Sequence, residues 1–208
     1  MKSANSTLRA ALTIGTIAAL SSAQAFWKPP GPEIPNFDAR PLGAGEAAKV
    51  QEAAVATLQA QVPGFRVHFD ERLGTPKWVR AERTFLSGPG AQGLAISPQT
   101  SASLQASEDY LATKAFLKEH HDLFGYGPEI LADARLKQDS ITAHNGLRTV
   151  IWQQEVDGIG VFEGLLISHT TKQEELVSVS SQFIPNAAQA AENGVPNHTA
   201  FGQNPTIS

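Results

Sequence analysis

A two-residue turn between two strand-like runs is the feature that most restricts the fold of this chain. Residues 148–156 and 159–170 are rich in β-branched and aromatic side chains, which favour strands. Asp157-Gly158 separates the two runs, and this dipeptide favours a tight hairpin turn because Asp and Gly tolerate positive φ. The sequence therefore predicts an antiparallel hairpin across residues 148–170.

Segments on both sides of the hairpin can extend the sheet and cover it. A further turn near residues 171–173 leads to a run that we interpret as a third strand, ending near Ile184. Upstream, residues 107–124 predict a helix with one apolar face, capped by Ser107 and ended by Gly125 or by Gly127 with Pro128. We expect the acidic residues of its first turn to be Glu108 and Asp109. Three antiparallel strands packed by a helix make an α+β fold.

The preceding half of the chain predicts a smaller helix-and-strand segment at residues 46–98. Apolar side chains recur at helical spacing up to Val62, and Pro63-Gly64 ends that helix. Residues 65–69 alternate between apolar and polar, as a half-buried strand does, and residues 77–84 can return as a second strand. Residues 87–103 are rich in Gly, Ser, Pro and Gln, so we expect a long loop there.

The start of the chain predicts export, and both ends contain segments that we expect to lie outside the folded domain. Residues 1–25 combine a basic start, a short apolar run and the pattern Ala23-Gln24-Ala25, which indicates a secretory signal peptide cleaved after Ala25. The apolar run is shorter than the ~20 residues of a membrane-spanning helix. Residues 26–45 predict a Pro/Gly-rich tether and residues 186–208 a flexible tail. We expect a secreted or periplasmic protein with no membrane contact after cleavage.

Composition and motifs exclude several kinds of chemistry. The chain of 208 residues has no cysteine, which excludes disulfides, thiolate zinc sites and cysteine nucleophiles. A formal charge of −4 provides no basic surface for nucleic acid. No Gly-x-Ser-x-Gly or His-Glu-x-x-His pattern occurs, and the Gly-x-Gly-x-x-Gly match at residues 88–93 is not followed by a helix-forming run.

One histidine cluster superficially resembles a metal site. In Glu119-His120-His121-Asp122 the two histidines are adjacent, so on a helix they point ~100° apart and do not converge on one ion. We expect His120 to lie at the boundary of the apolar face with a hydrogen-bonded ring nitrogen, and His121 to lie in solvent. The prediction is therefore a protein that is not an enzyme and has no catalytic, cofactor-binding or metal-binding residues.

The hairpin and its surroundings resemble the fungalysin/thermolysin propeptide motif, FTP. In that family a Gln-x-aromatic-x-Gly-x-x-Val pattern forms a hairpin, which is matched here by Gln154, Gly158 and Val161. Two departures are Val156, where an aromatic residue is common, and Gly160, where proline is frequent. The likeness covers residues 106–185 and, more weakly, residues 65–86. It implies a hairpin-rich antiparallel sheet, similar to those of cystatin and PepSY domains, packed by a helix.

The resemblance also selects candidate residues. We expect the Gln154 amide to bridge strands, Gly158 to permit the turn, and Val161 to begin the second strand together with Phe162. The family-motif residues, with a structural or partner-binding role, are Gln154, Asp157, Gly158, Val161, Phe162 and Gly164.

What the resemblance implies is the N-terminal prosegment of a secreted bacterial zinc metallopeptidase, which helps the catalytic domain to fold and keeps it inactive. The expected partner is that catalytic domain, in cis if the chain is truncated before its enzyme and in trans if it is a free-standing inhibitor or chaperone. The final residues 204–208 look like the approach to another helix, which favours truncation. The alternative is a secreted peptide-binding or surface interaction module, in which a sheet edge captures an extended peptide.

Overall fold

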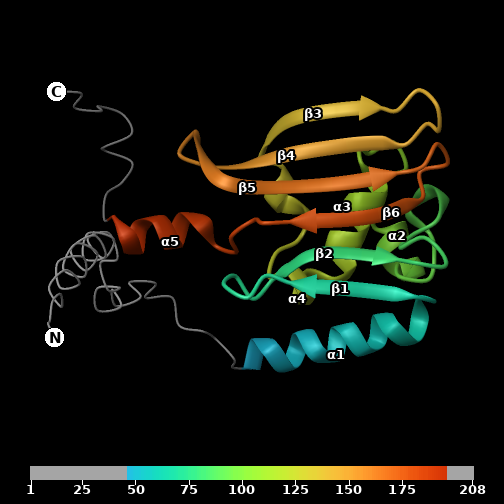
Figure 1. Cartoon of the computed structure of the whole chain (residues 1–208), viewed down its shortest axis with the longest axis horizontal. Coiled ribbons are helices and arrows are strands. Elements are labelled where there is room, and N and C mark those ends of the chain that lie inside the picture. Colours follow the sequence, from blue (N-terminus) through green and yellow to red (C-terminus); the bar gives the residue numbers. More distant parts are fainter. Residues whose placement is uncertain (1–45, 196–208) are drawn as a thin grey trace, which may run out of the picture. The chain divides into compact units, whose positions relative to one another are not determined.

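The computed structural model describes residues 46–195 and has a six-stranded antiparallel sheet at its centre. The strand order is β1-β2-β6-β5-β4-β3. Figure 1 shows the strands side by side with helices behind them. This arrangement confirms the α+β fold. The strands are β1 (Phe65–Phe69), β2 (Pro76–Ala81), β3 (Arg135–Ile141), β4 (Arg148–Val156), β5 (Ile159–Thr170) and β6 (Leu176–Ser181).

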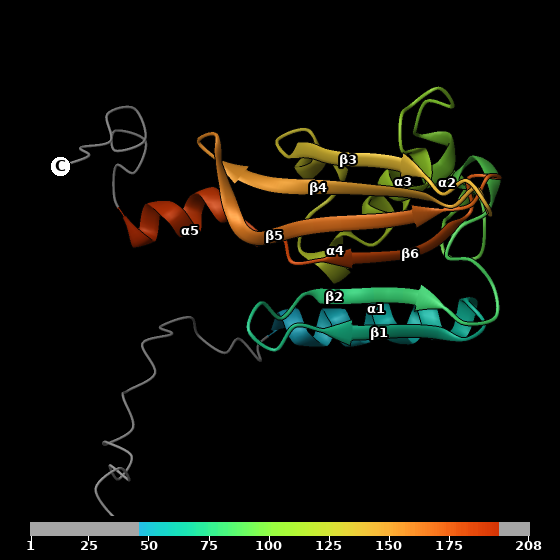
Figure 2. The same cartoon turned by 45° about the horizontal axis from the view of Figure 1, so that its top comes forward.

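The helices of the described part gather mainly on one face of this sheet. In Figure 2, α3 and α4 lie behind the strands β4 to β6, and α1 lies behind β1 and β2. The helices are α1 (Glu46–Gln61), α2 (Pro98–Ala102), α3 (Leu111–Glu119), α4 (His121–Phe124) and α5 (Ala187–Gly194), with 3-10 turns η1 (Pro89–Ala91) and η2 (Pro128–Leu131). The predicted signal peptide, the tether and the last part of the predicted tail fall outside the described residues.

The core lies between the helices and the covered face of the sheet. The apolar face predicted from the sequence is buried on both α3 and α4, with Phe116 and Phe124 in edge-to-face contact at 6.1 Å between ring centres. Side chains from four strands meet these rings, so one apolar layer joins the sheet to its helices. The strand residues in this layer include Val79, Val150, Trp152, Leu166, Leu176 and Val179.

The predicted helix at residues 107–124 is wrong at its start and is broken in the middle. Helix α3 begins at Leu111, because Tyr110 takes a left-handed conformation with φ of +60°. The Tyr110 ring meets Trp152 edge-on at 5.1 Å, and this packing overrides the cap expected at Ser107. His120 separates α3 from α4 with its ring Nε2 2.7 Å from the carbonyl oxygen of Ala95. Gly125, with φ of +77°, ends α4 as predicted.

The sheet is larger than the three strands predicted behind the helix. Strands β1 and β2 do not form a unit of their own, because Val79 of β2 is paired with Val179 of β6. Strand β3 was missed by the sequence interpretation, since every one of its residues is exposed and its side chains show no buried alternation. Two further predictions are wrong: the loop at residues 87–103 contains η1 and α2, and the tail begins with helix α5.

Candidate functional site

The hairpin turn between β4 and β5 has the geometry that its sequence predicts. Val156 and Ile159 are paired across the turn, which leaves a two-residue loop. Both loop residues have positive φ, with values of +53° for Asp157 and +77° for Gly158, as a type I′ turn requires. No atom lies within 4 Å of the position that a Cβ would take at Gly158, so this glycine is needed for backbone conformation and not for space.

Gln154 ties the middle of β4 to the chain that follows β6. Its side chain is 4% exposed, and its amide makes two hydrogen bonds with the backbone of Ile184. The Ile184 N–H donates to Oε1 at 2.9 Å, and Nε2 donates to the Ile184 carbonyl oxygen at 2.9 Å. One buried side chain therefore satisfies both backbone groups of a residue 30 positions away.

Gln153, also in β4, uses its side-chain amide to bind the backbone of the neighbouring strand β5. The pairs Gln153–Leu165 and Glu155–Gly160 place four residues of β5, numbers 161–164, opposite a single residue of β4. These four residues form a bulge, and Gln153 Nε2 donates to two carbonyl oxygens within it, those of Val161 at 2.5 Å and Gly164 at 3.1 Å. Gln153 was not selected from the sequence, although two adjacent amides in an apolar strand were a visible signal.

The bulge places Phe162 in solvent. Its side chain is 89% exposed, and Ile159 near the turn is 61% exposed. Phe162 lies near the start of β5, as expected, but a side chain so exposed adds almost nothing to the core. Val161 is half-buried and Gly164 is buried. The structure thus brings all six family-motif residues together at one end of the β4–β5 hairpin. Some of them, such as Gln154 and Gly164, are buried, whereas Phe162 is exposed.

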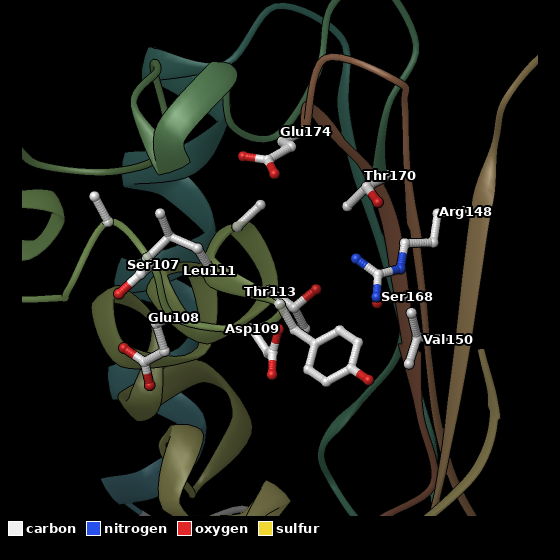
Figure 3. A pocket seen from close by; sticks show the side chains of 13 residues that line it. Ser107, Glu108, Asp109, Leu111, Thr113, Arg148, Val150, Ser168, Thr170 and Glu174 are labelled. Carbon is white, nitrogen blue, oxygen red and sulfur yellow. The ribbon is translucent and has the colours of Figure 1, made fainter. Parts of the chain in front are cut away.

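A second feature is a pocket of about 240 Å³ near the start of α3. Figure 3 shows Glu108 and Asp109 on the helix side of this pocket and Arg148 and Thr170 on the strand side. The guanidinium of Arg148 is paired with Asp139, by Nε to Oδ1 at 2.8 Å and by Nη2 to Oδ2 at 2.6 Å. The sequence interpretation selected none of these residues as a site.

Tyr110 completes the charged network beside this pocket. Its hydroxyl donates to Asp139 Oδ2 at 3.2 Å, and the Arg148 guanidinium lies 4.9 Å from the centre of its ring. The bond from Arg148 lowers the pKa of the Asp139 carboxyl, whereas burial, together with the nearby Asp139 charge, raises the pKa of the Tyr110 phenol. These groups satisfy one another, so the network holds β3 and β4 against the start of α3.

The residues of the histidine cluster make separate contacts. The carboxylate of Glu119 accepts a hydrogen bond from the Ser97 hydroxyl at 2.9 Å, while His120 contacts Ala95 and His121 pairs with Asp122 at the surface. Burial lowers the pKa of His120. Within residues 46–195, no group of three or more His, Cys, Asp or Glu side chains is placed to hold a metal ion. No helix in the same range is long and apolar enough to cross a membrane.

Comparison with known proteins identifies the segment that contains the hairpin. Residues 132–183 match the family model of the Fungalysin/Thermolysin Propeptide Motif, FTP. The match begins shortly before β3 and ends at Phe183, just after β6, so it includes the turn, the bulge and Gln154. The resemblance found in the sequence is therefore confirmed. No curated protein and no solved structure matches the chain.

Replacing Gly158 by valine tests the turn. A β-branched residue strains the backbone at φ of +77°, so we expect Gly158→Val to destabilise the protein by about 1 kcal/mol or more, measured by urea unfolding. Gly160→Val is the matched control, because Gly160 is not among the residues with positive φ and the nearest atom to its Cβ position is 3.6 Å away. Equal stability losses in the two variants would contradict the turn geometry.

Replacing Gln154 by alanine tests the bridge to Ile184. The change leaves the N–H and the carbonyl of the half-buried Ile184 without their partners and opens a cavity where the buried Gln154 side chain was, so we expect a loss of about 2 kcal/mol in the free energy of unfolding. Gln138→Ala on the exposed strand β3 is the control and should cost less than about 0.5 kcal/mol. A Gln154→Ala variant as stable as this control would show that the bridge contributes nothing.

The Arg148–Asp139 pair predicts a pH-dependent stability difference. A carboxyl whose pKa is lowered by folding stabilises the folded state above its unfolded pKa, near 3.8, and this contribution is lost as the pH falls through the folded pKa. We therefore expect Asp139→Asn to lower the melting temperature at pH 7 and to have a much smaller effect near pH ~2.5. The exposed Asp133→Asn is the control, and a pH-independent effect of Asp139→Asn would contradict the pairing.

Proposed function

We propose that this chain, whose residues 132–183 carry the fungalysin/thermolysin propeptide motif, binds a metallopeptidase catalytic domain as an inhibitor and folding chaperone. The motif indicates a metallopeptidase propeptide domain, and it is a propeptide motif and not a catalytic one. The observation that carries the proposal is the position of the matched segment, which contains the two buried glutamines and the exposed end of the hairpin.

A prosegment acts by shape, because it must present a fixed surface to the enzyme that it holds. The described sheet suits this task. Its hairpin is fixed by Gln153 and Gln154 through backbone hydrogen bonds, and its helix layer is fixed by a continuous apolar core. A surface that is ordered before binding does not lose conformational entropy when the complex forms, so more of the contact energy remains as affinity.

The same proposal includes the compartment in which the chain acts and whether its partner belongs to the same polypeptide. Propeptides of secreted peptidases act outside the cytoplasm, which agrees with the signal peptide that we infer at residues 1–25 with cleavage after Ala25. We propose that the chain acts as the prosegment of a zinc metallopeptidase, which it binds in cis. Acting in trans on a separate enzyme is the second form of the same function.

One observation favours a peptide-binding module as an alternative function. Strand β3 is an edge strand with every residue exposed, including Leu136 and Ile141, and an exposed edge can accept an extended peptide as a further strand. The same strand carries features that discourage such pairing. Its register shifts between Leu136 and Gln138, and Lys137 places a charge at that irregularity.

Enzyme inhibition tests the proposed function. The purified chain is mixed with thermolysin, and with a thermolysin-like metallopeptidase encoded beside it, while hydrolysis of a fluorogenic peptide is followed. We expect inhibition of at least one enzyme with a Kd of about 1 μM or tighter, or ~8 kcal/mol of binding free energy. We also expect a higher refolding yield of a denatured catalytic domain when the chain is present.

The control for this experiment is bovine serum albumin at the same concentration, which reveals competition by any added protein. Hydrolysis and refolding yields that are both unchanged by the chain would overturn the proposal. Capture of extended peptides without inhibition would support the edge-strand module instead.

A further inference from the structure

Phe162 is exposed in a way that its local structure enforces. It is 89% exposed, more than any other large apolar side chain recorded as exposed in residues 46–195, where the next values are 67% for Ile141 and 61% for Ile159. A large aromatic ring in water is unfavourable unless it is covered by something else. Phe162 lies in the bulge of residues 161–164, so the bulge backbone sets the direction of its Cα–Cβ bond.

Three features hold that backbone in place. The buried amide of Gln153 binds the carbonyl oxygens on both sides of Phe162 in the sequence, those of Val161 and Gly164. Glu163 takes a left-handed conformation with φ of +56°, which is uncommon for a residue other than glycine. At Gly164 a Cβ would lie 2.9 Å from the Val161 Cβ, so the bulge closes this tightly only with glycine there.

These constraints satisfy the buried Gln153 amide, and they leave the Phe162 side chain exposed. Backbone strain that persists in a fold is commonly found at binding sites, where it orders a group before the partner arrives. Aromatic side chains are also the residues that most often dominate the affinity of an interface, when they enter a pocket of the partner. Phe162 combines a constrained backbone with an exposed aromatic side chain.

Charges next to the ring indicate the chemistry of the partner. Glu163, the residue after Phe162, is exposed and acidic, and Asp157 at the turn adds a second exposed acidic residue to the end of the hairpin that carries Ile159 and Phe162. A partner that covers this end of the hairpin therefore needs an apolar pocket with basic residues at its rim.

We propose that Phe162 is the anchor with which the hairpin enters an apolar, basic-rimmed pocket of the metallopeptidase catalytic domain. The inference rests on the proposed function and names the part of the chain that makes the contact. Phe162 and the bulge lie within the segment that matches the propeptide motif, which places the anchor in the same region as the family resemblance.

Alanine substitution of Phe162 tests the anchor. The inhibition constants of wild-type chain and Phe162→Ala are measured with thermolysin as the probe, and we expect Phe162→Ala to inhibit at least ~10-fold less strongly. Ile141→Ala is the matched control, because it removes an exposed apolar side chain that is paired with Arg148 at the start of β4, away from the β4–β5 turn, and it should change inhibition less than ~2-fold. Both variants should melt at the wild-type temperature, since both side chains are exposed.

The adjacent charge provides a second measurement. We expect Glu163→Gln to slow association with thermolysin about threefold at low salt and to have little effect at high salt, as a charge at the rim of an interface does. A photo-crosslinking benzoylphenylalanine at position 162 should form a covalent adduct with thermolysin, and the same group at position 141 should not.

The outcomes separate the anchor from the function on which it rests. Wild-type chain that changes neither hydrolysis by, nor the refolding yield of, thermolysin and the metallopeptidase encoded beside it overturns both. Wild-type chain that inhibits, with Phe162→Ala inhibiting equally well, overturns the anchor alone. A Phe162→Ala variant with a strongly lowered melting temperature also overturns it, because the ring would then be part of the fold.

Discussion

Two adjacent glutamines in β4 determine how the rest of the hairpin is arranged. Neighbouring residues of a strand point to opposite faces, so Gln153 and Gln154 send their amides to different sides of the sheet, and both are buried. A buried amide without partners costs several kcal/mol, so each must find backbone groups to bind. Gln153 finds them in the bulge of β5, and Gln154 finds them at Ile184. The bulge and the path of the chain after β6 are both consequences of satisfying these amides.

Much of the fold could be predicted from local sequence, and the failures have identifiable physical causes. The turn at Asp157-Gly158 and the end of α4 at Gly125 were predicted because positive φ is a property of single residues and short motifs. The start of α3 was not, because Tyr110 is held by Trp152, Arg148 and Asp139, which are distant in sequence. Strand β3 was missed because a fully exposed edge strand carries no apolar pattern.

The candidate site could likewise be predicted from local sequence only in part. Gln154 and Gly158 could be selected from the sequence because their roles depend on residue type, an amide in a strand and a glycine in a turn. The exposure of Phe162 could not, because it depends on a four-residue bulge that no composition or periodicity marks. A phenylalanine in a β-branched run predicts a buried side chain, and only the register between β4 and β5 shows that it points into solvent.

The bridge from Gln154 also determines where the chain leaves the sheet. Because Ile184 is hydrogen-bonded to Gln154 of β4, the chain after it begins beside the hairpin, and α5 starts at the same end of the sheet as the turn between β4 and β5 (Figure 1). A cavity lined by residues 154–158 of the hairpin and by Asn186, Ala187 and Ala188 lies between them. Helix α5 therefore begins at the end of the sheet that presents Phe162. In the cis form of the proposed function, linkage raises the effective concentration of the catalytic domain at the anchor if the connecting chain can span the distance between them.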